Sequence, residues 1–390
     1  MREQEVFHAV FMRGGTSKAV FFKKGELPSD PVLRDKVILA VFGSPDIRQI
    51  DGMGGSDITT SKVAIISPSD RPDADVEYLF GQVQLKTDAV VWNVNCGNIS
   101  SAVGPFAIDE GMVPVTEPYT TVRVHNVNND QILLETVEVR DGMAAVEGDF
   151  AIDGVPGTGS RIDLDFKFTA GAKTGNILPT GNPVDMIDVE GIGTIPVSTV
   201  DMANIICFVK AEDLGATASE STPEIRQNAE LLEKLEKVRS TMAVKLGFCK
   251  PGENATLLSP LNPGINFVGP PQNYTDYATG KQILAANMDF CARGMFNQMP
   301  TDSFGGTSTF CTVVASLIDG TVVNQVRRKN ELEPGSTSFG HARGINKVGC
   351  KVHKDENGNY VVDSAIYPRT ARRIMDGLVY VKKSRIYDEQ

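Results

Sequence analysis

Short runs in which apolar and polar residues alternate follow one another along most of this chain. Alternation with a period of two is typical of strands that bury one face. In the first half it predicts strands at residues 5–12, 19–22, 61–67, 76–85, 89–94, 120–127, 131–139 and 144–149. In the second half it predicts strands at residues 194–200, 205–209 and 288–295.

Helical spacing is confined to a few stretches. Apolar residues recur every three to four positions in residues 30–42, 100–108, 223–246 and 310–318, and Gly247 is a typical stop after the third of these. The chain is therefore expected to be rich in strands, with few helices in each half.

The composition is that of a globular protein. The chain has 390 residues, enough for two domains, with 41% hydrophobic and 22% charged residues. Its net charge of −11 argues against nucleic acid or an anionic membrane as a partner. We expect a cytoplasmic protein, because the sequence shows neither a signal-peptide pattern nor a stretch long enough for a membrane helix. The cysteines are scattered without a CxxC pair, so neither a zinc site nor a disulfide framework is expected.

Cys96 occupies the most informative position in the sequence. A strand-like segment precedes it, and Cys96-Gly97-Asn98 leads into the apolar helical segment 100–108. The cysteine is therefore expected at a helix N-terminus, where the partial positive charge favours thiolate over thiol and free N–H groups can hold a carboxylate. Such a thiolate suits proton abstraction next to a carboxylate. From this stretch alone, a small buried hydrophobic residue is the favoured alternative, because free cysteine is among the most buried residue types.

The segment around Gly306 repeats this arrangement. Gly306-Thr307-Ser308-Thr309 opens the helical segment 310–318, much as Gly97-Asn98-Ile99-Ser100 opens the segment 100–108. Overlaying Gly306 on Gly97 puts Gly305 where Cys96 stands. We interpret this as a weak internal repeat of two β-rich halves, each with one central helix that opens at a turn of small residues.

Four clusters of small residues stand out, at residues 12–18, 51–57, 95–98 and 178–183. Glycine lets a backbone approach a ligand closely and present N–H donors, so the number of clusters favours anion binding over turn formation alone. None of them fits a P-loop or a dinucleotide-binding fingerprint, because GxxxxGK[ST] and a GxGxxG after a strand are both missing.

These clusters carry a resemblance to a known family. The sequence is similar to the PrpF family of cofactor-independent isomerases, within the diaminopimelate epimerase-like fold. The matching motifs run from residue 12 to about residue 373 and so cover nearly the whole chain. They are Met12-Arg13-Gly14-Gly15-Thr16-Ser17-Lys18, Asp51-Gly52-Met53-Gly54-Gly55, Thr60-Ser61-Lys62-Val63, Cys96-Gly97-Asn98 with Gly104-Pro105-Phe106-Ala107, Leu178-Pro179-Thr180-Gly181-Asn182, Pro270-Pro271-Gln272-Asn273-Tyr274, Gly320-Thr321-Val322-Val323-Asn324, and Gly340-His341 with Gly344.

The resemblance implies a fold and a site. We expect an α+β protein of two similar domains, each a β-barrel-like sheet wrapped round a central helix, with the active site in the cleft between them. The first domain would comprise residues 1–185 with a C-terminal strand at about 377–390, and the second residues 186–376. Cys96 and Lys62 are implied as the catalytic pair, with no metal and no cofactor. The residues expected to bind substrate are Gly14, Gly15, Thr16, Ser17, Met53, Gly54, Gly55, Ser56, Gly97, Asn98, Gly305, Gly306, Thr307 and His341.

The family's reaction is a 1,3-allylic proton shift on an unsaturated di- or tricarboxylate. Such a shift needs a base, an acid at the far carbon, and donors at the carboxylate. Cys96 can serve as the thiolate base or as a thiol that returns a proton, and Lys62 as its partner, so the order of the two stays open. Backbone N–H groups at residues 14–15, 54–55 and 97–98 would hold carboxylates, with Ser17 and Ser56 as hydroxyl donors.

The substrate is less defined than the reaction. The sequence departs from the family's usual pattern at Ala19, at residues 294–299 and at Ala342-Arg343. The less basic 294–299 run suits a dianion, which favours conversion of 3-methylitaconate to 2,3-dimethylmaleate over isomerisation of 2-methylaconitate or aconitate. From other classes, an amino-acid epimerase and a non-catalytic carboxylate-binding protein stay open, although the missing second cysteine argues against a two-thiol epimerase. A small carboxylate is the expected partner, and a homo-oligomer is left open.

Several of these residues have a plainer interpretation. Lys62 could be an ordinary strand lysine whose end reaches solvent. Thr16, Ser17 and Ser56 could merely satisfy turn backbones. His341 could be a ligand contact or a structural histidine in equal measure, and Arg293 could contact a carboxylate or form a surface ion pair.

Overall fold

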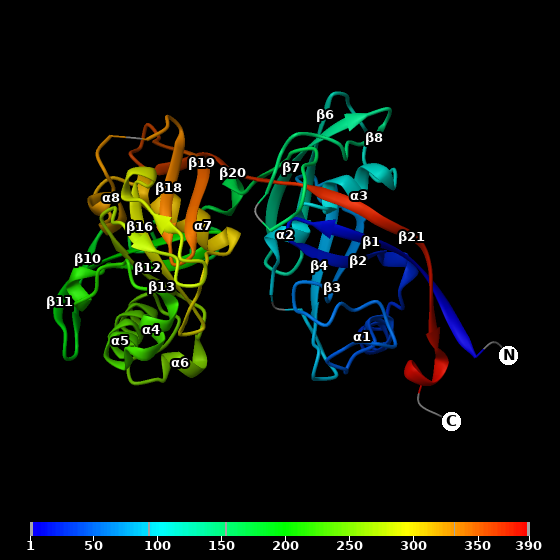
Figure 1. Cartoon of the computed structure of the whole chain (residues 1–390), viewed down its shortest axis with the longest axis horizontal. Coiled ribbons are helices and arrows are strands. Elements are labelled where there is room, and N and C mark those ends of the chain that lie inside the picture. Colours follow the sequence, from blue (N-terminus) through cyan, green and yellow to red (C-terminus); the bar gives the residue numbers. More distant parts are fainter. Residues whose placement is uncertain (1–2, 93, 153, 331, 388–390) are drawn as a thin grey trace. The chain divides into compact units, whose positions relative to one another are not determined.

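The computed structural model describes residues 3–92, 94–152, 154–330 and 332–387. The chain divides into two compact units (Figure 1). Unit 1 comprises Met1–Asp165 and Pro368–Gln390, and unit 2 comprises Phe166–Tyr367. The first unit is therefore built from both ends of the chain.

Unit 1 is a mixed sheet with short helices. Its strands are β1 (Gln4–Gly14), β2 (Ser17–Lys23), β3 (Lys62–Pro68), β4 (Val76–Val83), β5 (Val90–Val91), β6 (Tyr119–Asn126), β7 (Gln131–Arg140), β8 (Met143–Ala144), β9 (Ile162–Asp165) and β21 (Ala371–Lys382). Its helices are α1 (Pro31–Phe42), α2 (Gly97–Ser100) and α3 (Val103–Asp109). The strands pair in the order β21–β1–β2–β3–β4–β6–β7–β9, with β5 beside β4 and β8 beside β7.

Unit 2 is a second mixed sheet. Its strands are β10 (Asp185–Val189), β11 (Gly193–Met202), β12 (Asn204–Lys210), β13 (Gly264–Gly269), β14 (Tyr274–Thr275), β15 (Gln282–Ile283), β16 (Phe290–Phe296), β17 (Met299–Pro300), β18 (Ser336–His341), β19 (Gly344–Lys354) and β20 (Tyr360–Arg369). Its helices are α4 (Thr222–Gln227), α5 (Ala229–Lys245), α6 (Ala255–Leu258), α7 (Gly306–Leu317) and α8 (Val322–Val326). The main strands pair in the order β10–β11–β12–β13–β16–β18–β19–β20.

The two units have the same topology. Taken in these orders, successive strand pairs in both units are antiparallel, antiparallel, parallel, antiparallel, parallel, antiparallel and antiparallel. The connection across the second parallel pair contains α2 and α3 in unit 1 and α7 in unit 2. The fold is α+β, as predicted, and the repeated topology confirms the internal repeat.

The unit boundaries differ from the predicted ones, which fell after residues 185 and 376. Residues 166–184 belong to unit 2 because this segment is hydrogen-bonded to the end of β11. The N–H of Lys173 donates to the carboxylate of Asp201 at 2.9 Å, and the N–H of Asp201 donates to the carbonyl of Ile177 at 3.0 Å. Residues 371–376 belong to unit 1 because they are part of β21, which pairs with β1 along its length.

Two of the predicted helices are interrupted. The predicted helix 223–246 is split into α4 and α5 at Asn228, whose side chain instead caps α5 by accepting from the N–H of Leu231 at 3.0 Å. The predicted helix 100–108 is split into α2 and α3 at Ser101 and Ala102. Asparagine and serine compete for backbone hydrogen bonds, which favours such breaks. By contrast α1 has the expected bounds, with Asp30 capping the N–H of Leu33 at 2.8 Å.

Each unit has its own apolar core. In unit 1, Val37 and Phe42 of α1 are buried with Val63 of β3. In unit 2, Leu235 and Val238 of α5 are buried in another cluster of apolar side chains. Burial of one such side chain contributes about 1.5–3 kcal/mol, so these faces fix the helices on their sheets. No helix in the described part of the chain is long and apolar enough to cross a membrane.

Candidate active site

Cys96 is set apart from the other cysteines by its exposure. All six cysteines lie in the described part of the chain and are free, and the other five are buried. Cys96 is partly exposed and has an extended backbone (φ −139°, ψ 99°) as the N-cap residue of α2, so its predicted place at a helix N-terminus is confirmed. Cys96 is therefore not the small buried hydrophobic residue that was its alternative interpretation. Because α2 has only four residues, its first free N–H groups, rather than a long helix dipole, provide the local positive potential.

Three asparagines hold the backbone that carries Cys96. The N–H of Cys96 donates to Oδ1 of Asn95 at 2.7 Å, and Nδ2 of Asn126 donates to the same oxygen at 2.9 Å. The N–H of Asn128 donates to Oδ1 of Asn126 at 3.0 Å. The side-chain amide of Asn128 also exchanges two hydrogen bonds with the backbone of Phe80, at 2.7 and 2.8 Å. The loop before α2 is thereby tied to β6 and β4.

Lys62 begins β3 and is only 7% exposed. Its Nζ donates to Oε1 of Gln82 at 2.5 Å and lies 5.4 Å from the centroid of the Phe80 ring. The alternative of an ordinary strand lysine with its end in solvent does not hold. The ammonium group therefore lies against an aromatic ring and a neutral amide in a largely dehydrated position.

Gln82 is oriented by the backbone around it. It lies opposite Lys62 in the antiparallel register of β3 and β4. Its Nε2 donates to the carbonyl oxygens of Ser61 at 2.9 Å and Ile58 at 3.1 Å, which leaves Oε1 directed at Lys62. The sequence analysis missed Gln82, although an uncharged polar residue near the end of a mostly apolar strand was a usable signal.

The turn between β1 and β2 packs tightly against α2. A Cβ added to Gly14 would lie 2.6 Å from the backbone oxygen of Asn98, and one added to Gly15 would lie 2.3 Å from Oδ1 of Asn98. Gly15 also has φ +51°, which glycine adopts at little cost. Nδ2 of Asn98 donates to Oγ1 of Thr16 at 3.0 Å. The backbone of the turn therefore lies so close to α2 that a side chain would not fit at Gly14 or Gly15.

Two of the N–H groups predicted to hold carboxylates already have partners within the protein. The N–H of Gly15 donates to the carbonyl of Thr370 at 3.0 Å, and the N–H of Gly54 donates to the carbonyl of Phe42 at 3.2 Å. These amides are not free for a ligand in this structure. The sequence motif could not reveal this, because Thr370 comes from the far end of the chain.

The 51–56 loop is organised by Gln49, another residue that the sequence analysis missed. Oε1 of Gln49 accepts from the hydroxyl of Ser61 at 2.6 Å and from the N–H of Ser56 at 3.1 Å. The hydroxyl of Ser56 donates to the carbonyl of Arg48 at 2.8 Å, so it satisfies a turn backbone. The N–H of Met53 likewise donates to the carbonyl of a residue in α1, at 2.8 Å.

One end of the unit 1 sheet brings the central residues together. Strands β2 and β3 are parallel with Ala19 opposite Lys62, so their N-terminal ends lie side by side. The 14–17 turn leads into β2, and its Thr16 is bonded to Asn98 next to Cys96. The side chain of Ser17 is buried in the same turn. Lys62, this turn and Cys96–Asn98 thus occupy the same end of the sheet.

The predicted residues of unit 2 lie in the equivalent part of their own sheet. Gly305 is the N-cap residue of α7, as Cys96 is of α2, and Gly264 begins β13, as Lys62 begins β3. Unit 2 therefore has glycine at both positions where unit 1 has a cysteine and a lysine. Oγ1 of Thr307 accepts from Nδ2 of an asparagine at the start of β12, at 2.9 Å. A Cβ on the neighbouring Gly306 would lie 3.2 Å from an aromatic ring.

His341 and Arg293 are both buried in unit 2. Burial lowers the pKa of His341 to about 4, so its ring is neutral at pH 7. Its Nδ1 lies 3.1 Å from the carbonyl of Asp302 and 3.3 Å from the N–H of Arg343. Arg293 donates to backbone carbonyls, at 2.5 Å to that of Glu220, and stacks over a tyrosine ring, so it is not part of a surface ion pair.

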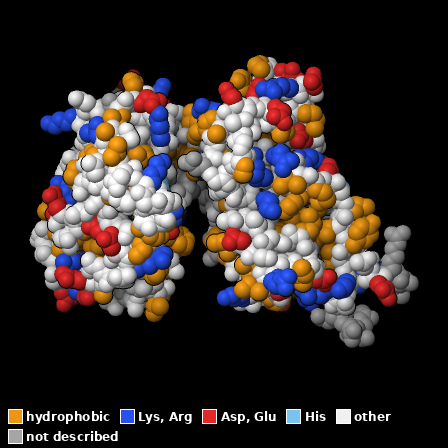
Figure 2. Space-filling model, in the orientation of Figure 1, with side chains coloured by type: hydrophobic (Ala, Val, Ile, Leu, Met, Phe, Trp, Pro, Cys, Tyr) orange, Lys and Arg blue, Asp and Glu red, His pale blue; other side chains and the backbone are white. Residues whose placement is uncertain are grey.

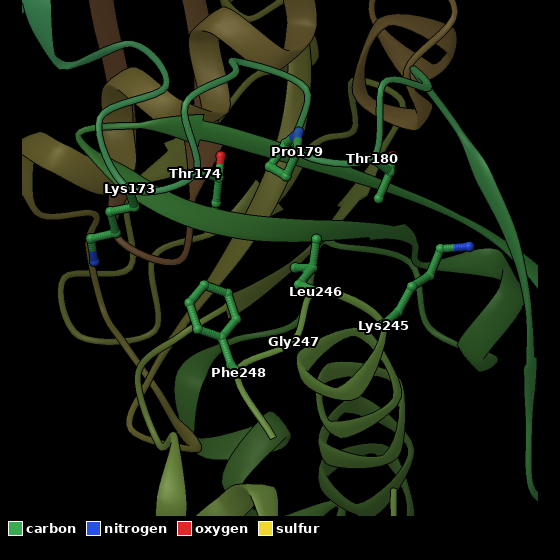
Figure 3. Close-up of a pocket in the computed structure, with 8 residues that line it drawn as sticks. All are labelled: Lys173, Thr174, Pro179, Thr180, Lys245, Leu246, Gly247 and Phe248. Carbon is green, nitrogen blue, oxygen red and sulfur yellow. The ribbon is translucent and has the colours of Figure 1, made fainter. Parts of the chain in front are cut away.

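A separate pocket of about 520 Å³ lies in unit 2 (Figure 3). Its lining includes part of the 178–183 cluster and none of the predicted site residues. The residues that line it are Lys173, Thr174, Pro179, Thr180, Lys245, Leu246, Gly247 and Phe248. The close-up shows the two ammonium groups on opposite sides of the pocket. Nζ of Lys173 donates to Asn262 at 2.8 Å, and that of Lys245 lies 3.1 Å from Asp185. Over the residues described, no group of three or more His, Cys, Asp or Glu side chains could hold a metal ion.

Comparison with known proteins gives consistent matches over the full length. The family model "PrpF protein" matches residues 4–382. The 3-methylitaconate isomerase of Eubacterium barkeri is 49% identical over 99% of this chain and 100% of its own length. The 2-methyl-aconitate isomerase of Shewanella oneidensis is 36% identical over 96% of each chain. A crystal structure of methylitaconate-delta-isomerase superposes with a TM-score of 0.90 at 47% identity, covering 100% of this chain and 98% of that one.

The fold and these relatives define an isomerase. The chain belongs to the PrpF family, which confirms the resemblance predicted from its motifs.

Proposed function

We propose that this isomerase converts 3-methylitaconate to 2,3-dimethylmaleate without a cofactor, using Cys96 and Lys62 to move the proton. The choice of substrate is supported by the 49% identity to the 3-methylitaconate isomerase of Eubacterium barkeri along the whole chain. The observation that carries the mechanism is the placement of a partly exposed cysteine and a buried lysine at one end of the unit 1 sheet.

The proposed reaction balances without any other reactant. A base takes the proton from the carbon that bears both a methyl group and a carboxylate. The electron pair of that C–H bond becomes the new C=C bond. The electrons of the old C=C bond then take up a proton at the terminal CH2 carbon, which becomes a methyl group. One group must accept a proton and another must supply one, and a thiol–amine pair can do both.

The surroundings of the two groups suit these tasks. The thiol of Cys96 is reachable, and its backbone is fixed by the three asparagines, so its direction is defined. The buried ammonium of Lys62 would stabilise negative charge that develops on the substrate. Either order of proton removal and return uses the same two groups.

The carboxylates of the substrate would meet free donors near the thiol. In our proposal these are the first N–H groups of α2, at Gly97 and Asn98, together with the hydroxyl of Ser17. Gly15 and Gly54 would contribute through close backbone packing, because their N–H groups are engaged. Contacts of the substrate with Gly305, Gly306, Thr307 and His341 of unit 2, and a cytoplasmic localisation, stay predictions.

The test is proton NMR of the purified protein in D2O, with 3-methylitaconate, 2-methylaconitate, cis-aconitate and 4-oxalomesaconate supplied separately. We expect conversion of 3-methylitaconate with deuterium entering the new methyl group. Preferred conversion of another acid would replace the proposed substrate within the same reaction class. If none of the four acids exchanges, exchange at the α-carbon of an amino acid supplied in a separate sample would favour an epimerase, and binding of an acid without any exchange would favour a carboxylate-binding protein.

The roles of the two residues are tested in the same assay. We expect Cys96→Ser and Lys62→Met each to lower kcat by about 10²–10⁴-fold, the usual contribution of general acid–base catalysis. Lys347→Met, which changes an exposed lysine of unit 2, is the matched control and should keep full activity. Near-normal turnover by folded Cys96→Ser or Lys62→Met would overturn the mechanism.

A further inference from the structure

Two positively charged residues of the 12–18 cluster have no role in the mechanism proposed above. Arg13 and Lys18 flank the turn at residues 14–17 and lie opposite one another in the register of β1 and β2. On its other side, Arg13 lies opposite Arg372 of β21. Residues directly opposite one another in antiparallel strands project from the same face of the sheet, so the three side chains follow one another across three strands. These three residues are called the cationic row below.

The side-chain contacts of the row agree with this placement. Nζ of Lys18 lies 5.5 Å from the centroid of the Phe11 ring, and Phe11 projects from the same face of β1 as Arg13 because the two are two residues apart. Nη1 of Arg13 donates to the carbonyl of Gly15 at 2.9 Å and to that of Thr370 at 2.8 Å. These two hydrogen bonds hold the guanidinium group beside the turn.

The cationic row has no acidic partner, unlike other cations of the same strands. Lys23 of β2 and Arg373 of β21 each contact a carboxylate oxygen of Glu110 at 2.6 Å. Over the residues that the structure describes, no ion pair joins a member of the row to a carboxylate. Burial, and after it the charge of Arg372, lowers the pKa of Arg13, as expected for like charges that lie opposite one another. The chain has 49 acidic residues, so three neighbouring cations without one indicate an anion from outside the protein.

The row lies at the end of the unit 1 sheet that carries Cys96. Arg13 directly precedes the turn that packs against α2, and Lys18 directly follows it. β2 runs beside β3, whose first residue is Lys62. Figure 2 shows Lys and Arg side chains gathered on the face of unit 1 where β1 and β21 run. An anion that approaches this end of the sheet therefore meets a positive potential.

We propose that the cationic row draws the dianionic substrate towards Cys96 by long-range attraction. This inference rests on the proposed function for the identity of the anion. The attraction reaches about 30 Å at an ionic strength of about 0.01 M and only about 3 Å at about 1 M. It speeds the encounter and does not act on the step in which the proton moves. The row therefore increases kcat/KM and leaves kcat nearly unchanged.

Alkylation of Cys96 measures this attraction without the natural substrate. Iodoacetate is an anion and iodoacetamide is neutral, and both react with the same thiolate. The ratio of their rate constants therefore reports the potential near Cys96, and the ionisation of the thiol cancels. We expect Lys18→Gln/Arg372→Gln to lower this ratio about threefold at an ionic strength of about 0.01 M, and the difference from the wild type to disappear at about 1 M. Neither side chain is buried, so the circular dichroism of this variant should match that of the wild type.

Steady-state kinetics with 3-methylitaconate should give a larger effect in the same variant. This substrate carries two negative charges, so kcat/KM should fall by about the square of the change in the labelling ratio, about tenfold, at low ionic strength. Lys18→Arg/Arg372→Lys keeps both charges and should behave like the wild type. Lys281→Gln/Lys351→Gln is the matched control, because it removes two exposed positive charges from unit 2.

An unchanged labelling ratio in Lys18→Gln/Arg372→Gln would overturn this inference, and so would an equal fall in Lys281→Gln/Lys351→Gln. A wild-type ratio that does not vary with ionic strength would overturn it as well. Failure of the proposed function gives a different result. In that case none of the four acids is converted, while the labelling ratio still depends on the cationic row.

Discussion

Replacing Gln82 with leucine tests the environment of Lys62 most directly. Leucine keeps much of the side-chain volume but removes the oxygen that accepts from Nζ at 2.5 Å. It also removes the two hydrogen bonds that hold the glutamine amide to the carbonyls of Ser61 and Ile58. The ammonium group would then face the Phe80 ring without an acceptor from β4.

The size of the effect follows from the burial of Lys62. Because this residue is only 7% exposed, water can replace the lost acceptor only in part. A hydrogen bond to a charged group contributes about 1.5–3 kcal/mol. At about 1.4 kcal/mol per factor of ten, this predicts a loss in kcat of about ten- to a hundredfold if Lys62 must be held in place in the transition state. KM should change much less, since Gln82 does not contact the substrate in our proposal.

The assay is steady-state kinetics with 3-methylitaconate between pH 5 and pH 10, with thermal unfolding measured on the same samples. Gln325→Leu is the matched control, because it removes a glutamine that donates to a carbonyl at 2.8 Å on the surface of unit 2. A structural role alone would lower the melting temperature and leave the pH profile unchanged. Unchanged kcat and an unchanged pH profile in folded Gln82→Leu would refute the reasoning.

Further expectations concern the thiol, the tight turn and a buried acid. Native protein should take up one carbamidomethyl group, at Cys96, and the Cys96→Ser variant none, as measured by intact mass, because the other cysteines are buried; labelling elsewhere first would contradict this. Gly14→Ala should lower activity at least about tenfold, since its Cβ would meet the backbone oxygen of Asn98 at 2.6 Å. Gly97→Ala, with no atom within 4 Å of the added Cβ, should fold normally, and equal melting temperatures of the two variants would contradict the packing argument. Burial raises the pKa of Glu135, so the folded state binds a proton that the unfolded state releases, and stability falls as the pH rises from about 4.5 through the folded-state pKa. Glu135→Gln should therefore gain about 2–4 °C in melting temperature relative to the wild type at pH 8 and little at pH 4.5, and a difference that does not vary with pH would show that Glu135 is not neutral in the folded protein.

The sequence predicted the family, the α+β class and the place of Cys96 because these depend on local signals. A strand, a run of small residues and an apolar helix can each be recognised from about twenty consecutive residues. The overlay of Gly305 on Cys96 succeeded for the same reason, and the repeated strand topology bears it out. The motif match added Lys62 to the predicted site. Nothing in the sequence alone indicates that this lysine is buried.

The residues that the sequence analysis missed depend on contacts between distant segments. Gln82 could be identified only from its register opposite Lys62. Asn126 could be identified only from its hydrogen bond to Asn95 in the loop before α2. The amide of Gly15 looked free because its acceptor, Thr370, is supplied by the other end of the chain. Local pattern cannot show which strand lies beside which, so partners of this kind need the fold.

The position of β21 has a consequence for how the protein is made. β1 leaves the ribosome before unit 2, and its partner β21 leaves after it. Unit 2, a continuous segment, can therefore be complete while the sheet of unit 1 still lacks an edge and Val381 has not yet joined its core. A premature stop just before β21 would consequently spare unit 2 and disable unit 1, which contains Cys96 and Lys62.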